Sequence, residues 1–342
     1  MQSARVVVDR DGIIENCHTV HAAIVDGNGN LLYALGDSAR VTLLRSCAKP
    51  LQALAILETG CGDQFDDADV ALVCASHSSE PDHIARALAM LERAGAQESD
   101  LRCDGHASLD PRVERSWARM EHQPTPINNN CSGKHAGMIA GSKELGLSSA
   151  DYHKPGHPME VHVRRVIEEV LTTGIPHNDQ VRWATDGCNL PAPAARLDTM
   201  AATYAGFARS RDRVSCGMSD LDVRTRYKSR IFESLTRYPE MVGGSDRFCT
   251  VLMRAYEGRL IGKLGADGCY GIAVRADRMI TTGHPNREVM GIAVKIEDGN
   301  VDILYVAYWK SCVNWASSQT NRSMRWMLKP FDVSHWPIVA IP

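Results

Sequence analysis

The stretch VHAAIVDGNGNLLYAL, residues 20–35, decides the fold class of this chain. Residues 20–26 and 30–35 are rich in the apolar and β-branched side chains that strands favour, and they flank Gly27-Asn28-Gly29. Glycine adopts positive φ angles at no steric cost, so these three residues favour a tight turn. The sequence therefore predicts an antiparallel hairpin near the N-terminus.

Strand-like segments recur late in the chain. GIAVRA (271–276) and GIAVKIEDGNVDILYVA (291–307) predict antiparallel strands, the second segment folding back at Asp298-Gly299. DVALVCA (69–75) is a continuous apolar run, typical of a buried strand. Strands at both ends with helices between them indicate an α+β fold, in which an antiparallel sheet is built from both chain termini and covered by helices.

Four segments between these strands carry helical patterns. RSCAKPLQALAILETG (45–60) predicts a helix that starts near Ser46 and stops at Gly60. Helices are also expected over residues 81–91, opened by a proline, over 131–146, and over 158–174, where apolar residues recur at helical spacing.

Composition excludes several classes of function. The 342 residues are 44% apolar and 23% charged, with a formal net charge of −3, which is ordinary for a globular protein and favours neither nucleic acid nor an anionic membrane. No apolar run has the length of a bilayer-spanning helix, and residues 1–11 lack the pattern of a secretory signal. We treat residues 1–342 as a single domain and expect a cytoplasmic protein.

The cysteine pattern points the same way. There are eleven cysteines, an odd number, and no two are spaced as a CxxC pair. Such a pattern suits reduced thiols in the cytosol better than a disulfide framework.

The motif Ser46-Cys47-Ala48-Lys49 is the first that carries possible chemistry. Residues three apart share one face of a helix, so the lysine amine can reach the serine hydroxyl. Serine becomes a good nucleophile only when a base takes its proton, and lysine is such a base only when it is uncharged. Its reference pKa is about 10.4, so burial or neighbouring cations such as Arg45 have to lower it. The alternative is a helix-capping serine beside a solvated lysine.

Two further residues are candidates for the same chemistry. Ser76 follows the predicted buried strand and precedes a polar loop, where reactive groups are often held. Lys263 lies among glycines in Gly262-Lys263-Leu264-Gly265, so a substrate can approach closely. Serine acylases of the penicillin-binding group combine an S-x-x-K helix with a lysine-glycine strand motif. Taken alone, each is equally an ordinary turn residue.

A metal site is suggested by Asn130-Cys131-Ser132-Gly133-Lys134-His135. Cys131 and Lys134 are three apart at a helix start, whose positive end favours a thiolate. A distant Cys188 is available to complete the site, because thiolates with nitrogen donors suit tetrahedral zinc.

These motifs together resemble one family. RSCAKPLQA (45–53), CASHSSE (74–80), NCSGKH (130–135), TDGCNLP (185–191) and GKLGAD (262–267) look like the signature blocks of the rhizobial-type L-asparaginases, the L-asparaginase II family. The blocks occur in that family's order and at similar separations, over roughly residues 5 to 307.

The resemblance implies a fold like that of the serine β-lactamases and penicillin-binding proteins, usually as a homodimer. It also implies L-asparagine as the substrate, two serine–lysine pairs and a zinc ion near the substrate. The residues at the matching positions are Ser46 with Lys49, Ser76 with Lys263, the zinc ligands Cys131, Lys134 and Cys188, and the pocket residues Arg45 and Asp186. We expect Ser46 to attack the side-chain amide, Asp186 to face the α-ammonium group and Arg45 the α-carboxylate.

The end of the chain departs from this pattern. Residues 309–342 hold four of the six tryptophans and do not match the family's usual ending. Two other functions stay open: a β-lactamase-like or penicillin-binding-like acylase, and a non-catalytic protein that binds asparagine or zinc. The absence of a secretory signal disfavours the first, since β-lactam targets lie outside the cytosol.

Overall fold

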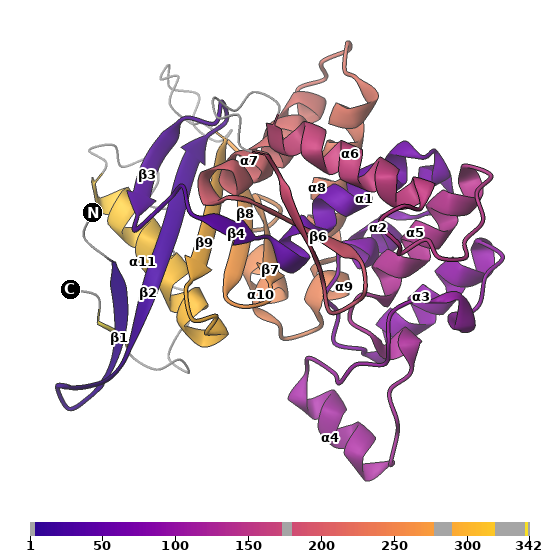
Figure 1. Ribbon diagram of the computed structural model, residues 1–342. Helices are drawn as coiled ribbons and strands as arrows, with labels where there is room; N and C mark the ends of the chain where they lie inside the picture. Colours follow the sequence, from indigo (N-terminus) through magenta and orange to yellow (C-terminus); the bar gives the residue numbers. More distant parts are fainter. Residues whose placement is uncertain (1–3, 173–179, 277–288, 319–338, 341–342) are drawn as a thin grey trace.

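The computed structural model describes residues 4–172, 180–276, 289–318 and 339–340. In Figure 1, strands β1, β2, β3 and β9 occupy one side of the molecule, and helices α1, α2, α3 and α5 occupy the other. The larger sheet runs in the order β10-β1-β2-β9-β8-β7, with β3 also paired to β2, and every pairing is antiparallel. Its strands are β1 (Arg5–Arg10), β2 (Ile13–Asp26), β3 (Leu31–Leu35), β7 (Leu260–Gly265), β8 (Cys269–Val274), β9 (Met290–Ile296) and β10 (Val339–Ala340).

This sheet confirms the predicted α+β class. Strand β2 from the N-terminal end pairs with β9 from the C-terminal end, with Val20 opposite Ile296. The predicted hairpin forms between β2 and β3, and Gly29 adopts a φ of +86° in the turn. The antiparallel sheet is therefore built from both ends of the chain.

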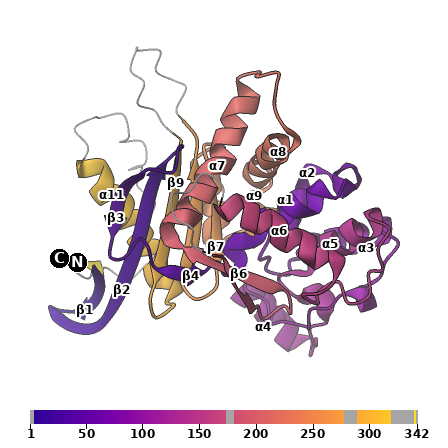
Figure 2. The same ribbon diagram turned by 45° about the horizontal axis from the view of Figure 1, so that its top comes forward.

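Two helices cover the sheet, α7 (Leu197–Ser215) on one face and α11 (Val301–Ser318) on the other, as Figure 2 shows. Helix α7 packs very close to β8 and β9 because these strands carry glycine at the contact. A Cβ atom on Gly291 would lie 1.7 Å from the carbonyl oxygen of Ala201, and one on Gly271 would lie 2.4 Å from the ring of Tyr204. The close approach of α7 thus depends on the absence of side chains in both strands.

The remaining helices form the second half of the molecule. Helix α5 lies in the interior of this half, and every residue from Ser132 to Ser142 is buried. A small sheet of order β4-β6-β5 lies between this half and the larger sheet. The elements are α1 (Lys49–Glu58), α2 (Asp67–Val73), α3 (Pro81–Arg93), α4 (Pro111–Arg119), α5 (Ser132–Glu144), α6 (Pro158–Thr172), α8 (Val223–Arg237), α9 (Pro239–Gly243), α10 (Phe248–Ala255), β4 (Val41–Leu43), β5 (Arg182–Thr185) and β6 (Pro191–Arg196).

The prediction of a buried strand over residues 69–75 is wrong, because this segment is helix α2 and the turn that follows it. Asp66 begins the helix by accepting a hydrogen bond from the amide of Asp69 at 2.8 Å, and the carboxylate of Asp69 accepts one from the amide of Asp66 at 3.1 Å. The helix is buried from Ala68 to Val73, so it lacks the polar face that marks a helix in sequence.

The second half of the segment 291–307 is also not a strand. The chain turns at Gly299, where φ is +83°, and α11 begins at Val301. The side chain of Asn300 accepts a hydrogen bond from the amide of Ile303 at 3.0 Å, which is a helix-capping contact.

The atypical tail is only partly described. Helix α11 carries the chain through residue 318, and residues 319–338 lie outside the described part. Residues 339–340 form β10, in which Val339 pairs with Val8 at the edge of the sheet. Among the described residues, no helix combines the length and the apolar character needed to cross a membrane.

The close packing of α7 is testable by adding one methyl group. Gly291→Ala forces the helix away from β9, and we expect a loss of about 3 kcal/mol in the free energy of unfolding, measured by chemical denaturation followed by circular dichroism. Gly156→Ala is the matched control, because nothing lies within 4 Å of a Cβ atom there. Equal stability of both variants with the parent protein would contradict the proposed contact.

Candidate active site

Two lysine amines meet at one serine hydroxyl. The Nζ atom of Lys49 lies 3.1 Å from Oγ of Ser76, and Nζ of Lys263 lies 2.9 Å from the same oxygen. Lys49 is the first residue of α1, Lys263 lies in β7, and Ser76 lies in the loop after α2. The three residues come from segments far apart in sequence, so only the tertiary structure brings them together.

The backbone around Ser76 explains this placement. The Ser76 amide donates to the carbonyl of Val242 at 3.0 Å, and the next amide donates to the carbonyl of Asn130 at 3.2 Å. Strand β7 reaches the start of α1 because Gly265 has no side chain, since a Cβ atom there would lie 2.6 Å from the carbonyl oxygen of Leu44. These contacts bring the Ser76 loop and β7 to the same point.

Burial determines whether the two lysine amines are charged. Lys49 and Lys263 are each only 1% exposed. Burial and the nearby charge of Lys49 lower the pKa of Lys263 to about 8. Two ammonium groups on one buried hydroxyl repel each other and lose hydration, so the uncharged form of Lys263 becomes accessible near neutral pH. An uncharged lysine beside a serine is the arrangement that general-base activation requires.

Ser46 and Ser76 line one pocket. Ser46 lies in the short 3₁₀ helix Arg45–Ala48 that leads into α1. Its side chain is partly exposed and forms no hydrogen bond within the described part of the chain. The structure therefore joins Lys49 to Ser76, whereas the sequence paired Lys49 with Ser46. Ser46 and Lys49 still stand one helical turn apart, with the Lys49 amide donating to the carbonyl of Ser46.

Arg45 and its acidic partners form another part of the wall. Nε of Arg45 lies 2.9 Å from Oδ1 of Asp186, and its Nη1 contacts the carboxylate of Asp267. Burial would raise the pKa of Asp186, but the charges of Lys134 and Arg45 lower it below the usual range. Arg45 and Asp267 both adopt left-handed backbone angles, with φ of +50° and +57°, which are uncommon for non-glycine residues.

The predicted metal ligands also converge. Nζ of Lys134 lies 3.1 Å from Sγ of Cys188. The thiol of Cys131 donates to Oδ1 of Asn130 at 3.0 Å and also interacts with Cys188. All three side chains are buried. The hydrogen bond from Cys131 and the charge of Lys134 outweigh burial and lower the pKa of Cys188 well below the usual range. Cys131 shows the opposite shift, since its hydrogen bond to Cys188 and burial raise its pKa to about 12.

This donor set fits a zinc ion in chemical type. Two sulfur atoms and one amine suit tetrahedral zinc and leave a fourth position for a water molecule or substrate. Within the residues that the structure describes, no three side chains drawn from His, Cys, Asp and Glu are arranged to hold a metal, so a metal bound to Cys131 and Cys188 would need Lys134 as its third ligand. Burial alone would lower the pKa of Lys134, but the negative charges of Cys188, Cys131 and Asp186 raise it. A metal ion therefore has to displace the lysine proton.

A pocket of 470 Å³ is lined by six of the nine predicted site residues. Its size is within the range of small-molecule sites. The predicted residues on its wall are Arg45, Ser46, Ser76, Cys131, Asp186 and Cys188, and the wall also includes His106, Asn129, Arg247 and Asp267. Arg247 was not predicted because it lies in none of the signature blocks, and a lone arginine in a loop has no sequence pattern that marks it.

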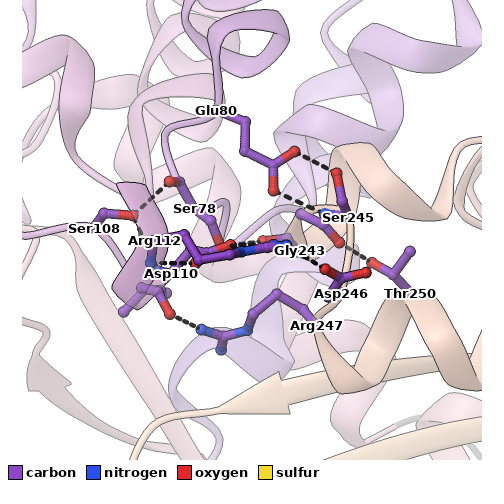
Figure 3. A network of polar contacts seen from close by, with 12 residues as sticks. Ser78, Glu80, Ser108, Asp110, Arg112, Gly243, Ser245, Asp246, Arg247 and Thr250 are labelled. Atoms are coloured by element: carbon purple, nitrogen blue, oxygen red, sulfur yellow. Dashed lines mark hydrogen bonds and ion pairs between the residues drawn. The ribbon is translucent and has the colours of Figure 1, made fainter. Parts of the chain in front are cut away.

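Arg247 belongs to a polar network that joins two loops (Figure 3). Arg112 pairs with Asp110 at 2.6 Å and with Asp246 at 2.5 Å, and it thereby ties the start of α4 to the loop before α10. Arg247 donates to the carbonyl of Leu109 at 2.7 Å and forms no ion pair within 4 Å among the described residues. One wall of the pocket is thus held by charge pairs, while the guanidinium of Arg247 keeps donors for a ligand.

Comparison with protein families gives one match over most of the chain. The family model described as L-asparaginase II matches residues 6–330. The match extends beyond residue 307, where the sequence resemblance ended, and so includes α11 and part of the atypical tail. No curated protein sequence matches the chain significantly.

Solved structures give distant similarities only. A probable glutaminase of Bacillus subtilis is 12% identical, with a TM-score of 0.39, and the match covers 86% of this chain and 88% of that one. A structure described as Mglu is 12% identical, with a TM-score of 0.37 and coverages of 92% and 69%. A second Mglu structure, in its native form with 4.3 M NaCl, is 14% identical, with a TM-score of 0.36 and coverages of 84% and 59%.

The pKa of Cys188 yields a spectroscopic prediction. In chelator-treated protein at neutral pH, Cys188 carries a thiolate, whose ultraviolet absorbance disappears as the pH falls through its lowered pKa. Lys134→Met and Cys131→Ala each remove a cause of the shift, so the pKa of Cys188 rises and the absorbance moves to higher pH.

Cys61→Ala is the control for this titration, because burial raises the pKa of Cys61 to about 11 and it contributes no thiolate at neutral pH. A neutral-pH absorbance that survives in Cys188→Ser would contradict the assignment.

Proposed function

Because the chain belongs to the L-asparaginase II family, a family of amidohydrolases, we propose that it hydrolyses the side-chain amide of L-asparagine to L-aspartate and ammonia. The observation that carries this proposal is the contact of Lys49 and Lys263 with Ser76 beside a pocket that also exposes Ser46. This arrangement provides hydroxyl groups together with buried amines able to take their protons. A cytoplasmic homodimer stays a prediction from the sequence.

We assign the attack to Ser46. Its hydroxyl is partly exposed to the pocket and free of hydrogen bonds in the described structure, whereas Ser76 is already held by two amines. Lys49 lies one turn further along and contacts Ser76, which in turn contacts Lys263. A path for a proton therefore leads away from the nucleophile Ser46, through Lys49 and Ser76 to Lys263. Hydrogen bonds that are absent without substrate often form only in the reactive complex.

The reaction then proceeds in two steps. Oγ of Ser46 bonds to the amide carbon of asparagine while Lys49 takes its proton and passes one of its own through Ser76 to the uncharged Lys263. A proton returned through Lys49 to the nitrogen lets the C–N bond break and ammonia leave. Water, activated by Ser76 and Lys263, cleaves the β-aspartyl ester and restores the hydroxyl of Ser46.

Charged groups on the wall orient the substrate. The carboxylate of Asp186 binds the α-ammonium group, because its lowered pKa keeps it ionised. Arg45 binds the α-carboxylate, although Asp186 and Asp267 already pair with it. Arg247 is a second cation on this wall, and it has no carboxylate within 4 Å in the described residues. Because Asp186 and Asp267 compete with the substrate for Arg45, we assign Arg247 as the second group that binds the α-carboxylate of asparagine.

The zinc ion belongs to the same proposal. Cys131, Lys134 and Cys188 would hold it, and the bound metal would polarise an oxygen of the substrate. The charge of Lys134 lowers the pKa of Asp186. Asp186 therefore connects the proposed metal ligands with the residues proposed to bind the substrate. In our assignment the metal organises the pocket, while the serine and lysine residues carry the covalent steps.

The nucleophile assignment is tested with two serine variants. Ser46→Ala is expected to lower ammonia release from asparagine by roughly three orders of magnitude and to abolish any trapped acyl adduct. Ser76→Ala, which removes the proton relay and one of the groups that activate water, is expected to lose roughly a hundredfold and still form the adduct on Ser46. Release of ammonia is followed enzymatically, and the adduct is located by mass spectrometry.

Glutamine and a β-lactam are the comparison substrates in this assay. An adduct found on Ser76 would exchange the two serine roles, and opening of the β-lactam without release of ammonia from asparagine would replace the proposed function with that of a β-lactamase-like acylase. Calorimetric binding of asparagine without turnover would identify a non-catalytic binding protein.

Chelation tests the role of zinc. Removing the metal from purified protein of known metal content is expected to raise KM for asparagine several-fold with a smaller change in kcat, because the metal organises binding. Cys188→Ser should reproduce this effect and lose the metal. A large fall in kcat at unchanged KM would show instead that the metal acts in the chemical step.

A further inference from the structure

A second pocket lies away from the candidate active site, between the β2–β3 turn and helices α6, α7 and α8. Its volume is 190 Å³, and it shares no lining residue with the larger pocket. Three cations line it: Arg209 from α7, and Arg224 and Lys228 from α8. The proposed asparagine hydrolysis uses none of them.

Within the described residues, one of these cations, Arg224, is neutralised by acids, and one of those acids, Glu169, also lines the pocket. Nε and Nη2 of Arg224 contact the carboxylate of Glu58 at 2.6 and 2.9 Å, and Nη2 lies 3.0 Å from Glu169. Among the described residues, Arg209 donates only to the carbonyl of Gly27, at 2.8 Å. Lys228 forms no hydrogen bond or ion pair within the described residues. Two of the three cations on this pocket, Arg209 and Lys228, therefore have no carboxylate partner in the part of the chain that the structure describes.

The surroundings make this excess charge unfavourable. Burial, together with the charges of Arg224 and Arg209, lowers the pKa of Lys228 to about 8. Glu58 and Asp222 act in the opposite direction, but they do not offset the shift. A partly buried ammonium group near two guanidinium groups is stabilised by an anion that takes its hydrogen bonds.

The turn supplies another donor. Asn28, an exposed residue of this turn, lines the pocket. Its backbone amide donates to Asp26 at 2.8 Å, and its side chain forms no hydrogen bond within the described residues. Among the residues that line the pocket, the side-chain amide of Asn28, Nζ of Lys228 and the remaining guanidinium protons of Arg209 are therefore available as donors. Thr203, also on the wall, is occupied by a bond to the carbonyl of Thr199 at 2.9 Å.

We propose that this pocket is a binding site for a small oxyanion, a phosphate or a short dicarboxylate, held by Lys228, Arg209 and Asn28. Both anions present several oxygen acceptors to donors on one wall, and both are small enough for 190 Å³. The bound anion links the β2–β3 turn to α7 and α8. It thereby stabilises the contact between the sheet and the helical half of the protein.

The test uses inorganic phosphate and malonate as separate probes on the full-length protein. Calorimetry is expected to show binding of at least one of them, and that anion should raise the melting temperature. Lys228→Met and Arg209→Met are each expected to weaken binding roughly tenfold or more, because each removes a charge-assisted hydrogen bond. Asn28→Ala should weaken it less.

Arg226→Met is the matched control, since it removes one positive charge from an exposed position of the same helix, where the side chain donates only to the carbonyl of Leu221. Binding by phosphate alone identifies a phosphate site, binding by malonate alone a carboxylate site, and binding by both the shared oxyanion chemistry. Absence of binding by either probe, or equal affinity in Lys228→Met and Arg226→Met, would overturn the proposal.

Circular dichroism spectra of all four variants keep this comparison independent of folding defects. Ammonia release from asparagine is measured in parallel, because none of these residues lies on the wall of the larger pocket. Unchanged activity together with lost anion binding places the effect at the second pocket alone.

Discussion

The structure depends on two lysine amines sharing one buried hydroxyl. Lys49 and Lys263 are almost completely buried, and both contact Oγ of Ser76. Water cannot screen their charges there, so the protein has to keep one amine uncharged or supply negative charge nearby. The lowered pKa of Lys263 reflects this constraint. The same repulsion that is unfavourable for folding makes an uncharged lysine available as a base.

The buried ammonium group of Lys134 is stabilised in another way, by nearby sulfur and carboxylate groups. Lys134 contacts Cys188, and its charge also helps to keep Asp186 ionised. Asp186 in turn pairs with Arg45, which also contacts Asp267. Positive and negative groups therefore alternate from the proposed metal ligands to the proposed substrate-binding residues. A change at one end should alter the ionisation of the other.

Backbone packing makes both arrangements possible. Gly265 lets β7 approach the turn before α1, and Gly291 lets α7 approach the sheet. A Cβ atom at Gly133 would lie 2.7 Å from the carbonyl oxygen of Leu72, so the start of α5 also requires a glycine to reach the end of α2. Close approaches at these positions bring Lys263, Ser76 and Lys134 into one region.

Much of this protein is determined by local sequence. The Gly27-Asn28-Gly29 turn, the strands at both ends and the helix predicted to start near Ser46 follow from patterns within a few residues. In the structure, residues 45–48 of that helix form a 3₁₀ turn and the α-helix begins at Lys49. The motif blocks also contain all nine predicted site residues, six of which line the pocket. The tertiary structure decided what these patterns leave open. Residues 69–75 form a helix because buried helices and buried strands are equally apolar. Lys49 contacts Ser76, and Arg247 joins the pocket wall, because these contacts depend on how distant segments pack.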